Sequence, residues 1–315
     1  MDTTELVVRQ MRWESQDVMS VRLEKSDGAA LAAWTPGAHI DIHLGPTLIR
    51  QYSLCGDPDD KTGYRIAVLR DPASRGGSKH VHEMLRPGQL VSVSEPRNNF
   101  ELIDSPHFLF IAGGIGITPI LSMIREVSRR GASWELHYGG RTRRGMAFLD
   151  EIAEFRGAVD IVCEDSAGML NLPDLLAAPR PNTLVYTCGP EGLLAAVESH
   201  GTAWPEGAIQ LERFKPKVAA PVGVDGDRPV RLVCSRSGIS AVAAPDKSIL
   251  DTLEEAGLDP SNSCREGMCG SCETPVLEGI PDHRDSVLSA AEQSSGKTMM
   301  ICVSRARTDE LVLDL

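Results

Sequence analysis

Several things are scarce in this sequence of 315 residues. Aromatic side chains make up 4% of it, so each Phe, Tyr or Trp at an unusual position stands out. Positive charge is in deficit, because 32 Lys and Arg residues face 44 Asp and Glu residues and leave a net charge of −12. A chain with this balance is a poor partner for a nucleic-acid backbone. It suits docking onto a basic patch of another protein instead.

Long apolar runs are also missing. The best one, residues 107–120, is interrupted by three glycines and a proline, whereas a helix that spans a bilayer needs roughly 20 apolar residues. The N-terminal sequence MDTTELVVRQ lacks the basic-then-apolar order of a secretory signal. We therefore expect a cytoplasmic protein without a membrane partner, in a compartment where disulfides are rare.

Cysteine, by contrast, is plentiful, and four of the eight cysteines form one pattern. The segment SCREGMCGSC has C-x4-C-x2-C spacing, and a further cysteine follows after 29 intervening residues. This is the spacing of the plant-type [2Fe–2S] ferredoxins. The candidate cluster ligands are Cys264, Cys269, Cys272 and Cys302.

Small residues between these cysteines favour the cluster. Gly267, Gly270 and Ser271 let the loop wrap closely, so that backbone N–H groups can donate to the cluster sulfurs. The alternatives are a structural zinc site or unrelated free thiols. Zinc sites more often use paired C-x2-4-C knuckles, which a triplet and a single cysteine match poorly. The scattered cysteines are predicted to be small, buried and inert: Cys55, Cys163 and Cys234.

Local patterns divide the chain into four parts, in line with the two or three domains that its length predicts. Residues 1–104 hold short alternating segments between turns, which predict an antiparallel β-barrel. Residues 105–214 alternate strands and helices, which predicts a doubly wound parallel sheet with ligands at the carboxyl ends of its strands. Residues 215–228 are predicted to be a linker. Residues 229–315 are predicted to form a compact module in which a strand carries the last cysteine.

A glycine-rich turn, AGGIGITP, joins the first strand of the predicted parallel sheet to a helix. Thr118 is predicted to be the N-cap of that helix, with Pro119 in its first turn. Gly113, Gly114 and Gly116 would let a pyrophosphate approach the helix N-terminus. The turn is not the G-x-G-x-x-G fingerprint, so a plain turn without a ligand is the alternative.

Two further strand ends carry candidate nucleotide contacts. TCGP would set Cys188, Gly189 and Pro190 against a flat ring. YGGRTRR offers Arg141 to a phosphate, whereas Arg144 is interpreted as solvated. A simple turn and a solvated loop are the alternatives.

The barrel region holds two more motifs. RQYSL, residues 50–54, combines Tyr with Arg and Ser, a set that can stack on a planar ring and bind a phosphate. RGGS, residues 75–78, precedes a short predicted helix and can offer N–H and O–H donors to a terminal phosphate. Each motif alone is weak, because an ordinary strand and an ordinary loop explain them as well.

The motifs RQYSL, RGGS, GGIGITP, YGGRTR, CGP and the four cysteines follow one another in a fixed order. This ordered set resembles the phthalate dioxygenase reductase family, which includes vanillate O-demethylase reductases, over essentially the whole chain. The resemblance implies a flavin-binding barrel, an NAD domain and a C-terminal β-grasp domain with a [2Fe–2S] cluster. NADH would pass a hydride to FMN, and single electrons would leave through the cluster to a terminal oxygenase of the Rieske type. A reductase for a diiron hydroxylase or a P450 is an alternative, as is a non-catalytic zinc-binding scaffold.

The resemblance also implies roles for single residues. It assigns the flavin to Arg50, Gln51, Tyr52, Ser53, Ala67, Val68, Gly76, Gly77, Ser78, Thr118 and Phe214. It assigns NAD to Gly113, Gly114, Gly116, Arg141, Cys188, Gly189 and Pro190, with Cys188 positioning the nicotinamide and no acid or base needed. The domain order favours FMN over FAD. Glu164 and Asp165 favour the ribose of NADH, although Arg141, Arg143 and Arg144 could tolerate a 2′-phosphate.

Overall fold

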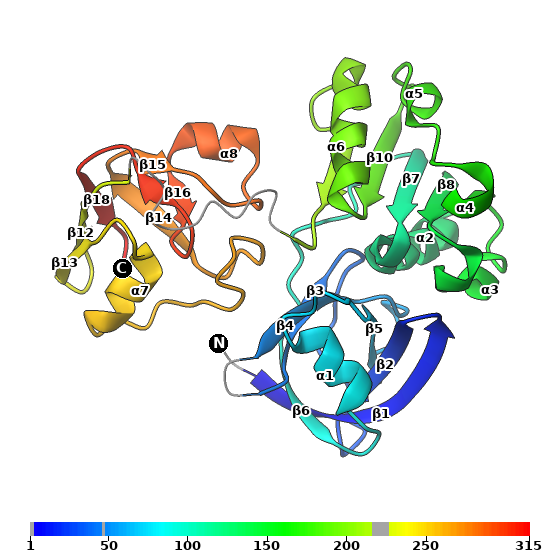
Figure 1. Ribbon diagram of the computed structural model, residues 1–315, viewed down its shortest axis with the longest axis horizontal. Helices are drawn as coiled ribbons and strands as arrows, with labels where there is room; N and C mark the ends of the chain where they lie inside the picture. The colour runs from blue at the N-terminus through cyan, green and yellow to red at the C-terminus, as the bar shows by residue number, and fades with distance from the viewer. Residues whose placement is uncertain (1–2, 46–47, 216–226) are drawn as a thin grey trace. The chain divides into compact units, whose positions relative to one another are not determined.

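The computed structural model describes residues 3–45, 48–215 and 227–315, and it leaves out the side chain of residue 290. Its contacts divide the chain into one compact unit that ends at Phe214 and another that runs from Lys215 to Leu315 (Figure 1). Most of the predicted linker lies outside the described residues. No helix in the described ranges is long and apolar enough to cross a membrane.

The first part of the first unit is a six-stranded antiparallel sheet in the order β4-β3-β6-β1-β2-β5. Its strands are β1 (Thr3–Ser15), β2 (Val18–Glu24), β3 (His39–His43), β4 (Ile49–Ser53), β5 (Tyr64–Leu69) and β6 (Leu90–Ser94), and helix α1 (Gly77–Glu83) follows β5. Alternate side chains point to a common core, as Ile40 and Ile42 do on β3. The edge strands β4 and β5 meet at the single bridge between Leu54 and Ile66, so the barrel closes at one point.

The second part of this unit is a five-stranded parallel sheet in the order β11-β10-β7-β8-β9. Its elements are β7 (His107–Gly113), α2 (Ile117–Arg130), β8 (Ser133–Gly140), α3 (Leu149–Ile152), β9 (Ala158–Cys163), α4 (Glu164–Ala167), α5 (Leu172–Leu175), β10 (Thr183–Cys188), α6 (Glu191–His200) and β11 (Ile209–Glu212). Helix α2 packs on one face and α5 and α6 on the other, which is the predicted doubly wound arrangement.

The start of α2 differs from the prediction. Its N-cap is Gly116 and not Thr118, and no side chain caps it. The glycine turn continues as a short 3-10 helix over Gly114–Gly116, which leads directly into α2. Thr118 therefore already lies within the helix, where its hydroxyl donates to the carbonyl of Ile115 at 3.0 Å.

The barrel and the parallel sheet share an apolar core and an ion-pair cluster. Ala67 of β5 packs in the same core as Ile117 and Ile120 of α2. Beside it, the guanidinium of Arg65 donates to both carboxylate oxygens of Glu151 on α3, at 2.9 and 2.7 Å. A paired guanidinium and carboxylate in this geometry fix orientation as well as distance.

Two turns at the carboxyl ends of β7 and β10 touch without side chains between them. A Cβ at Gly116 would lie 2.2 Å from the carbonyl oxygen of Cys188. A Cβ at Gly189 would lie 3.0 Å from the backbone nitrogen of Gly113. These glycines therefore serve the contact between the two turns, and it is Gly114, with a φ of +52° and no neighbour within 4 Å, that faces open space.

The second unit contains a five-stranded sheet in the order β13-β12-β18-β14-β16 and a two-stranded sheet of β15 and β17. Its elements are β12 (Val230–Cys234), β13 (Ser240–Ala243), α7 (Ile249–Glu255), β14 (Glu273–Glu278), β15 (Pro281–Asp282), α8 (Ala290–Ser295), β16 (Thr298–Met300), β17 (Arg305–Ala306) and β18 (Glu310–Leu313). The prediction that Cys302 lies on a strand is wrong. Strand β16 ends at Met300, whose carbonyl accepts hydrogen bonds from the N–H groups of Val303 and Ser304, so Cys302 lies in a turn.

The contact between the two turns yields a test of stability. We expect Gly116→Ala to lower the free energy of unfolding by about 1–3 kcal/mol, because the new methyl group overlaps the backbone at Cys188. Gly192→Ala, within α6 and with no atom within 4 Å of the new Cβ, is the matched control and should be neutral or stabilising. Thermal unfolding followed by circular dichroism measures both, and equal midpoints would contradict the expectation.

Candidate functional site

The gap between β4 and β5 brings four of the predicted flavin residues together. The bridge from Leu54 to Ile66 is antiparallel, so continuing its register places Ser53 opposite Ala67 and Tyr52 opposite Val68. Because β4 and β5 are edge strands, their facing backbones can accept a planar ring between them. The side chain of Val68 packs in the barrel core, so only its backbone can contribute there.

The phosphate motifs RQYSL and RGGS also meet, although 25 positions separate Arg50 from Arg75. The guanidinium of Arg50 donates to the carbonyl of Arg75 at 2.7 Å. Its side chain lies so close to Gly77 that a Cβ there would be 2.4 Å from the Arg50 Cγ. Gly76 takes a φ of +97°, which only glycine adopts readily. The arrangement sets a positive charge beside the backbone at the start of α1, where a terminal phosphate fits.

One buried donor in this strand supports the fit of a flavin. The Nε2 atom of Gln51 is buried and has no hydrogen-bond partner among the described residues. An unpaired buried donor is unfavourable, and a ring carbonyl would satisfy it. The individual flavin contacts of these residues stay predictions.

A carboxyl group that the sequence did not single out lies where the barrel and the parallel sheet meet. Glu212 ends β11, in register with Cys188 at the end of β10, and its Oε2 lies 4.0 Å from the Cys188 sulfur. Its carboxyl also hydrogen-bonds the hydroxyl of Ser53 on β4. Burial raises the pKa of Glu212 to about 8, so the carboxyl holds a proton through much of the neutral range.

The same surroundings keep the thiol of Cys188 neutral. Burial raises its pKa well above the ordinary value, and any ionisation of Glu212 raises it further. A neutral thiol is a weak nucleophile, so Cys188 is suited to packing against a ring rather than to covalent chemistry.

The predicted NAD residues divide into two groups. Gly113, Gly116 and Gly189 build the contact between the turns, as described above. Arg141 is exposed at the end of β8, and its carbonyl accepts the N–H of Asp165 at 3.1 Å, so the candidate ribose and phosphate contacts are neighbours. Three arginines at this edge have no carboxylate partner among the described residues. They are Arg141, Arg143 and Arg144.

The end of the first unit is held in place just before its aromatic residue. Arg213 is 7% exposed in its side chain and pairs with Glu191 at 3.0 Å and Glu198 at 2.8 Å, both on α6. Phe214 follows with 41% of its surface exposed, which leaves a ring face available for a partner ring. Its contact with the flavin stays a prediction.

In the second unit the four cysteine sulfurs form two pairs. Cys264 hydrogen-bonds Cys269 and thereby lowers the pKa of Cys269. Cys302 hydrogen-bonds Cys272 and lowers the pKa of that thiol in the same way. In the described ranges, no three His, Cys, Asp or Glu side chains gather as they would around one metal ion. Two pairs of thiols fit a cluster of two irons better than they fit a single tetrahedral zinc.

Backbone N–H groups surround these sulfurs. The N–H groups of Glu266 and Met268 point at the Cys264 sulfur, with nitrogen–sulfur distances of 3.3 and 3.4 Å. Gly267 has a φ of +65°, and its N–H donates to the Cys302 sulfur. Donors of this kind stabilise thiolates and the negative charge of a cluster. The loop therefore fits a [2Fe–2S] cluster held by the four cysteines that the sequence predicts as its ligands.

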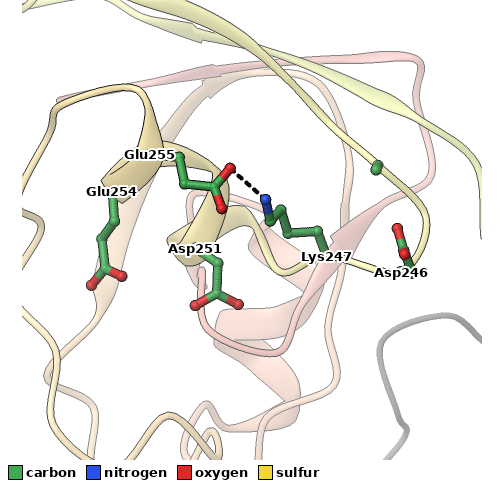
Figure 2. A pocket seen from close by; sticks show the side chains of 6 residues that line it. Asp246, Lys247, Asp251, Glu254 and Glu255 are labelled. Carbon is green, nitrogen blue, oxygen red and sulfur yellow. Dashed lines mark hydrogen bonds and ion pairs between the residues drawn. The ribbon is translucent and has the colours of Figure 1, made fainter.

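The surface next to this loop is acidic. An open hollow beside α7 is lined by Asp246, Lys247, Asp251, Glu254 and Glu255 (Figure 2). Lys247 pairs with Glu255, and Arg265 of the cysteine loop reaches Asp251 at 2.8 Å and also bonds Glu254. Four carboxylates and two cations leave this face with an excess of two negative charges.

Edge strands that can accept a planar ring, paired glycine turns at the carboxyl ends of parallel strands and a ferredoxin-type cysteine loop in one chain together point to an NAD-dependent flavin and iron–sulfur oxidoreductase. Known proteins agree with this class. Residues 110–165 match the model of the oxidoreductase NAD-binding domain. Residues 233–307 match the model of the 2Fe-2S iron-sulfur cluster binding domain.

Full-length relatives identify the family. The chain is 42% identical to phenoxybenzoate dioxygenase subunit beta of Ectopseudomonas oleovorans, over 98% of this chain and 97% of the relative. It is 40% identical to vanillate O-demethylase oxidoreductase of a Pseudomonas strain, with 99% of both chains covered. A solved structure of phthalate dioxygenase reductase shares 36% identity at a TM-score of 0.72, covering 99% of this chain and 98% of that one. The chain belongs to the phthalate dioxygenase reductase family.

One similar structure has a different context. A self-sufficient cytochrome P450 monooxygenase is 40% identical at a TM-score of 0.92, and the match covers 99% of this chain. The chain spans only 41% of that protein, so the similarity concerns one part of it.

The raised pKa of Glu212 yields a pH-dependent test. Folding raises this pKa from the ordinary value of 4.5 to about 8, so the folded state binds the proton more tightly than the unfolded state does. The contribution of Glu212 to the free energy of unfolding is therefore fully present below about pH 4.5 and is lost as the pH rises through 8. We expect Glu212→Gln to remove most of that fall, on the order of a few kcal/mol, in flavin-free protein unfolded by heat at several pH values.

The control for this test is Glu206→Gln, which alters an exposed carboxylate in the same unit. It should keep the pH dependence of the parent protein. Parallel curves for Glu212→Gln and the parent would show that Glu212 does not hold the proton.

Proposed function

We propose that this chain is the reductase component of a two-component Rieske-type oxygenase. Nicotinamide gives up electrons in pairs as hydride and a [2Fe–2S] cluster takes them singly, and a flavin converts between the two. The observation that supports this function is the presence in one chain of three candidate binding sites. They are the β4–β5 gap for the flavin, the paired turns after β7 and β10 for the nucleotide, and the cysteine loop for the cluster.

The protein's own residues would bind and orient the cofactors. Arg50 and the backbone at Gly77 would hold the flavin phosphate, and Gln51 would donate to the ring. The neutral thiol of Cys188 and the turn at Gly189 would hold the nicotinamide ring flat. Accepting a hydride adds one negative charge to a ring, so the protonated carboxyl of Glu212 would be placed to give its proton towards that ring through the hydroxyl of Ser53, and Glu212 would be left as a carboxylate.

We infer that the flavin is FMN and that the nucleotide is NADH. RGGS leads straight into the short helix α1, which leaves no added segment there for an adenine. Glu164 and Asp165 at the start of α4 would repel a 2′-phosphate and accept hydrogen bonds from a ribose. The exposed arginines at the end of β8 would then contact the pyrophosphate side.

We also infer that the electron acceptor docks at the acidic face beside α7. That face adjoins the cysteine loop through Arg265, so a basic surface on the partner would be drawn close to the cluster. The relatives named for phenoxybenzoate dioxygenase and phthalate 4,5-dioxygenase support an oxygenase as this partner. The eight free cysteines suit the reducing cytoplasm.

The second candidate partner is a P450, and the specific observation for it is the match to one part of a self-sufficient P450 monooxygenase. A zinc-binding scaffold has no such support, because the sulfurs are paired and the relatives are reductases. We favour the Rieske oxygenase because relatives covered over at least 93% of their own length are named as subunits or oxidoreductases of dioxygenase and demethylase systems, whereas the P450 is matched over only part of its length.

The order of electron flow can be tested at a single cysteine. We expect Cys269→Ser to reduce its flavin with NADH at the normal rate but to lose cytochrome c reduction at least roughly 100-fold, since even outer-shell changes cost 10–100-fold at metal sites. The control, Cys234→Ser, changes a buried cysteine of the same unit that lies outside the two pairs. Stopped-flow absorbance reports flavin reduction, and mass analysis of the released flavin should give FMN. Full cytochrome c reduction by Cys269→Ser would disprove this order.

The partner can be tested by reconstitution. The purified reductase should sustain product formation by a Rieske-type oxygenase faster than by a P450 or a diiron hydroxylase. Its rate should fall several-fold with rising salt, because attraction between opposite charges is screened. A higher rate with the P450 would replace the Rieske proposal by the second candidate.

A further inference from the structure

A short segment in the second unit touches both halves of the cysteine site without contributing a ligand. We call residues 282–286, with the sequence DHRDS, the strap. On one side, the N–H of Ser286 donates to the carbonyl of Gly267 in the cysteine loop at 2.9 Å. On the other side, the N–H of Arg284 donates to the hydroxyl of Ser304, two positions after Cys302, at 3.2 Å.

The contacts of the strap are buried and closely packed. Ser304 is fully buried, and its hydroxyl donates to the carboxylate of Asp285 at 3.4 Å. A Cβ at Gly267 would lie 3.1 Å from the Cα of Asp285 and 2.6 Å from the side chain of Val303. The loop that donates N–H groups to the sulfurs can therefore not move without moving the strap.

The strap is in turn held by one ion pair at its centre. The guanidinium of Arg284 donates to both carboxylate oxygens of Asp227, one of them at 3.0 Å, and to Asp282 at 3.0 Å. The exposed fractions are 14% for the Arg284 side chain and 6% for that of Asp227, so water screens the pair little. Asp227 precedes β12, which places this anchor at the start of the described part of the second unit.

We propose that Arg284, held by Asp227, is a positioning residue for the [2Fe–2S] cluster. It fixes the strap, and the strap in turn contacts the loop at Gly267 and the turn that holds Cys302. Hydrogen bonds to cluster sulfurs set both the reduction potential and the strength of binding. Loosening the strap therefore changes the properties of the cluster, and not only the stability of the fold. This inference rests on the four cysteines being the ligands.

The test compares Arg284→Gln with Arg236→Gln in the full-length holoprotein. Arg236 is the matched control, because it lies in the same unit and also pairs with an aspartate, Asp314. The side chain of Arg236, however, is 72% exposed. We expect Arg284→Gln to shift the midpoint potential and the electron paramagnetic resonance g values of the reduced cluster. It should also lose cluster absorbance roughly 10-fold faster in the presence of a chelator. Flavin reduction by NADH should stay unchanged, and Arg236→Gln should behave as the parent protein.

A second variant keeps the proposal testable if Arg284→Gln does not fold. Asp227→Asn retains the guanidinium but weakens its anchor, so it should move the potential in the same direction. The double variant should then add little, because both changes break one interaction. Arg284→Lys should restore part of the parent behaviour. Parent-like potential and g values in either folded variant would overturn the proposal, whereas a Cys269→Ser protein that keeps its cluster would instead overturn the ligand assignment.

Discussion

The contact between the barrel and the parallel sheet is the constraint on which the rest of the first unit depends. Neither sheet holds the proposed hydride-transfer site alone, because Ser53 comes from the barrel and Cys188 and Glu212 from the parallel sheet. The shared apolar core gives the contact its free energy. The two hydrogen bonds from Arg65 to Glu151 give it an orientation.

The two units handle charge in opposite ways. In the first unit, burial keeps Glu212 and Cys188 protonated, so the ring-binding edge is close to neutral. In the second unit, backbone N–H groups point at the Cys264 sulfur, and pairing lowers the pKa of Cys269 and Cys272 while it raises that of Cys264 and Cys302, so one thiol of each pair can bear a negative charge. The chain supplies each of these surroundings from local backbone geometry and packing.

How much the sequence could predict depended on how local each interaction is. The cysteine triplet was predictable because its ligands lie within nine positions on one loop, and the parallel sheet because strand and helix patterns are local. Glu212 and Arg284 were not, since their partners Ser53 and Asp227 are distant in the sequence. Thr118 was misassigned because the glycine turn continues as a 3-10 helix, which no composition rule indicates.

The single bridge between the edge strands β4 and β5 has a consequence for the newly made chain. Without the proposed ring between them, these two strands present open hydrogen-bonding edges, and such edges can recruit strands from neighbouring molecules. Under the proposed flavin assignment, protein without its flavin would therefore be more prone to aggregate than the loaded protein.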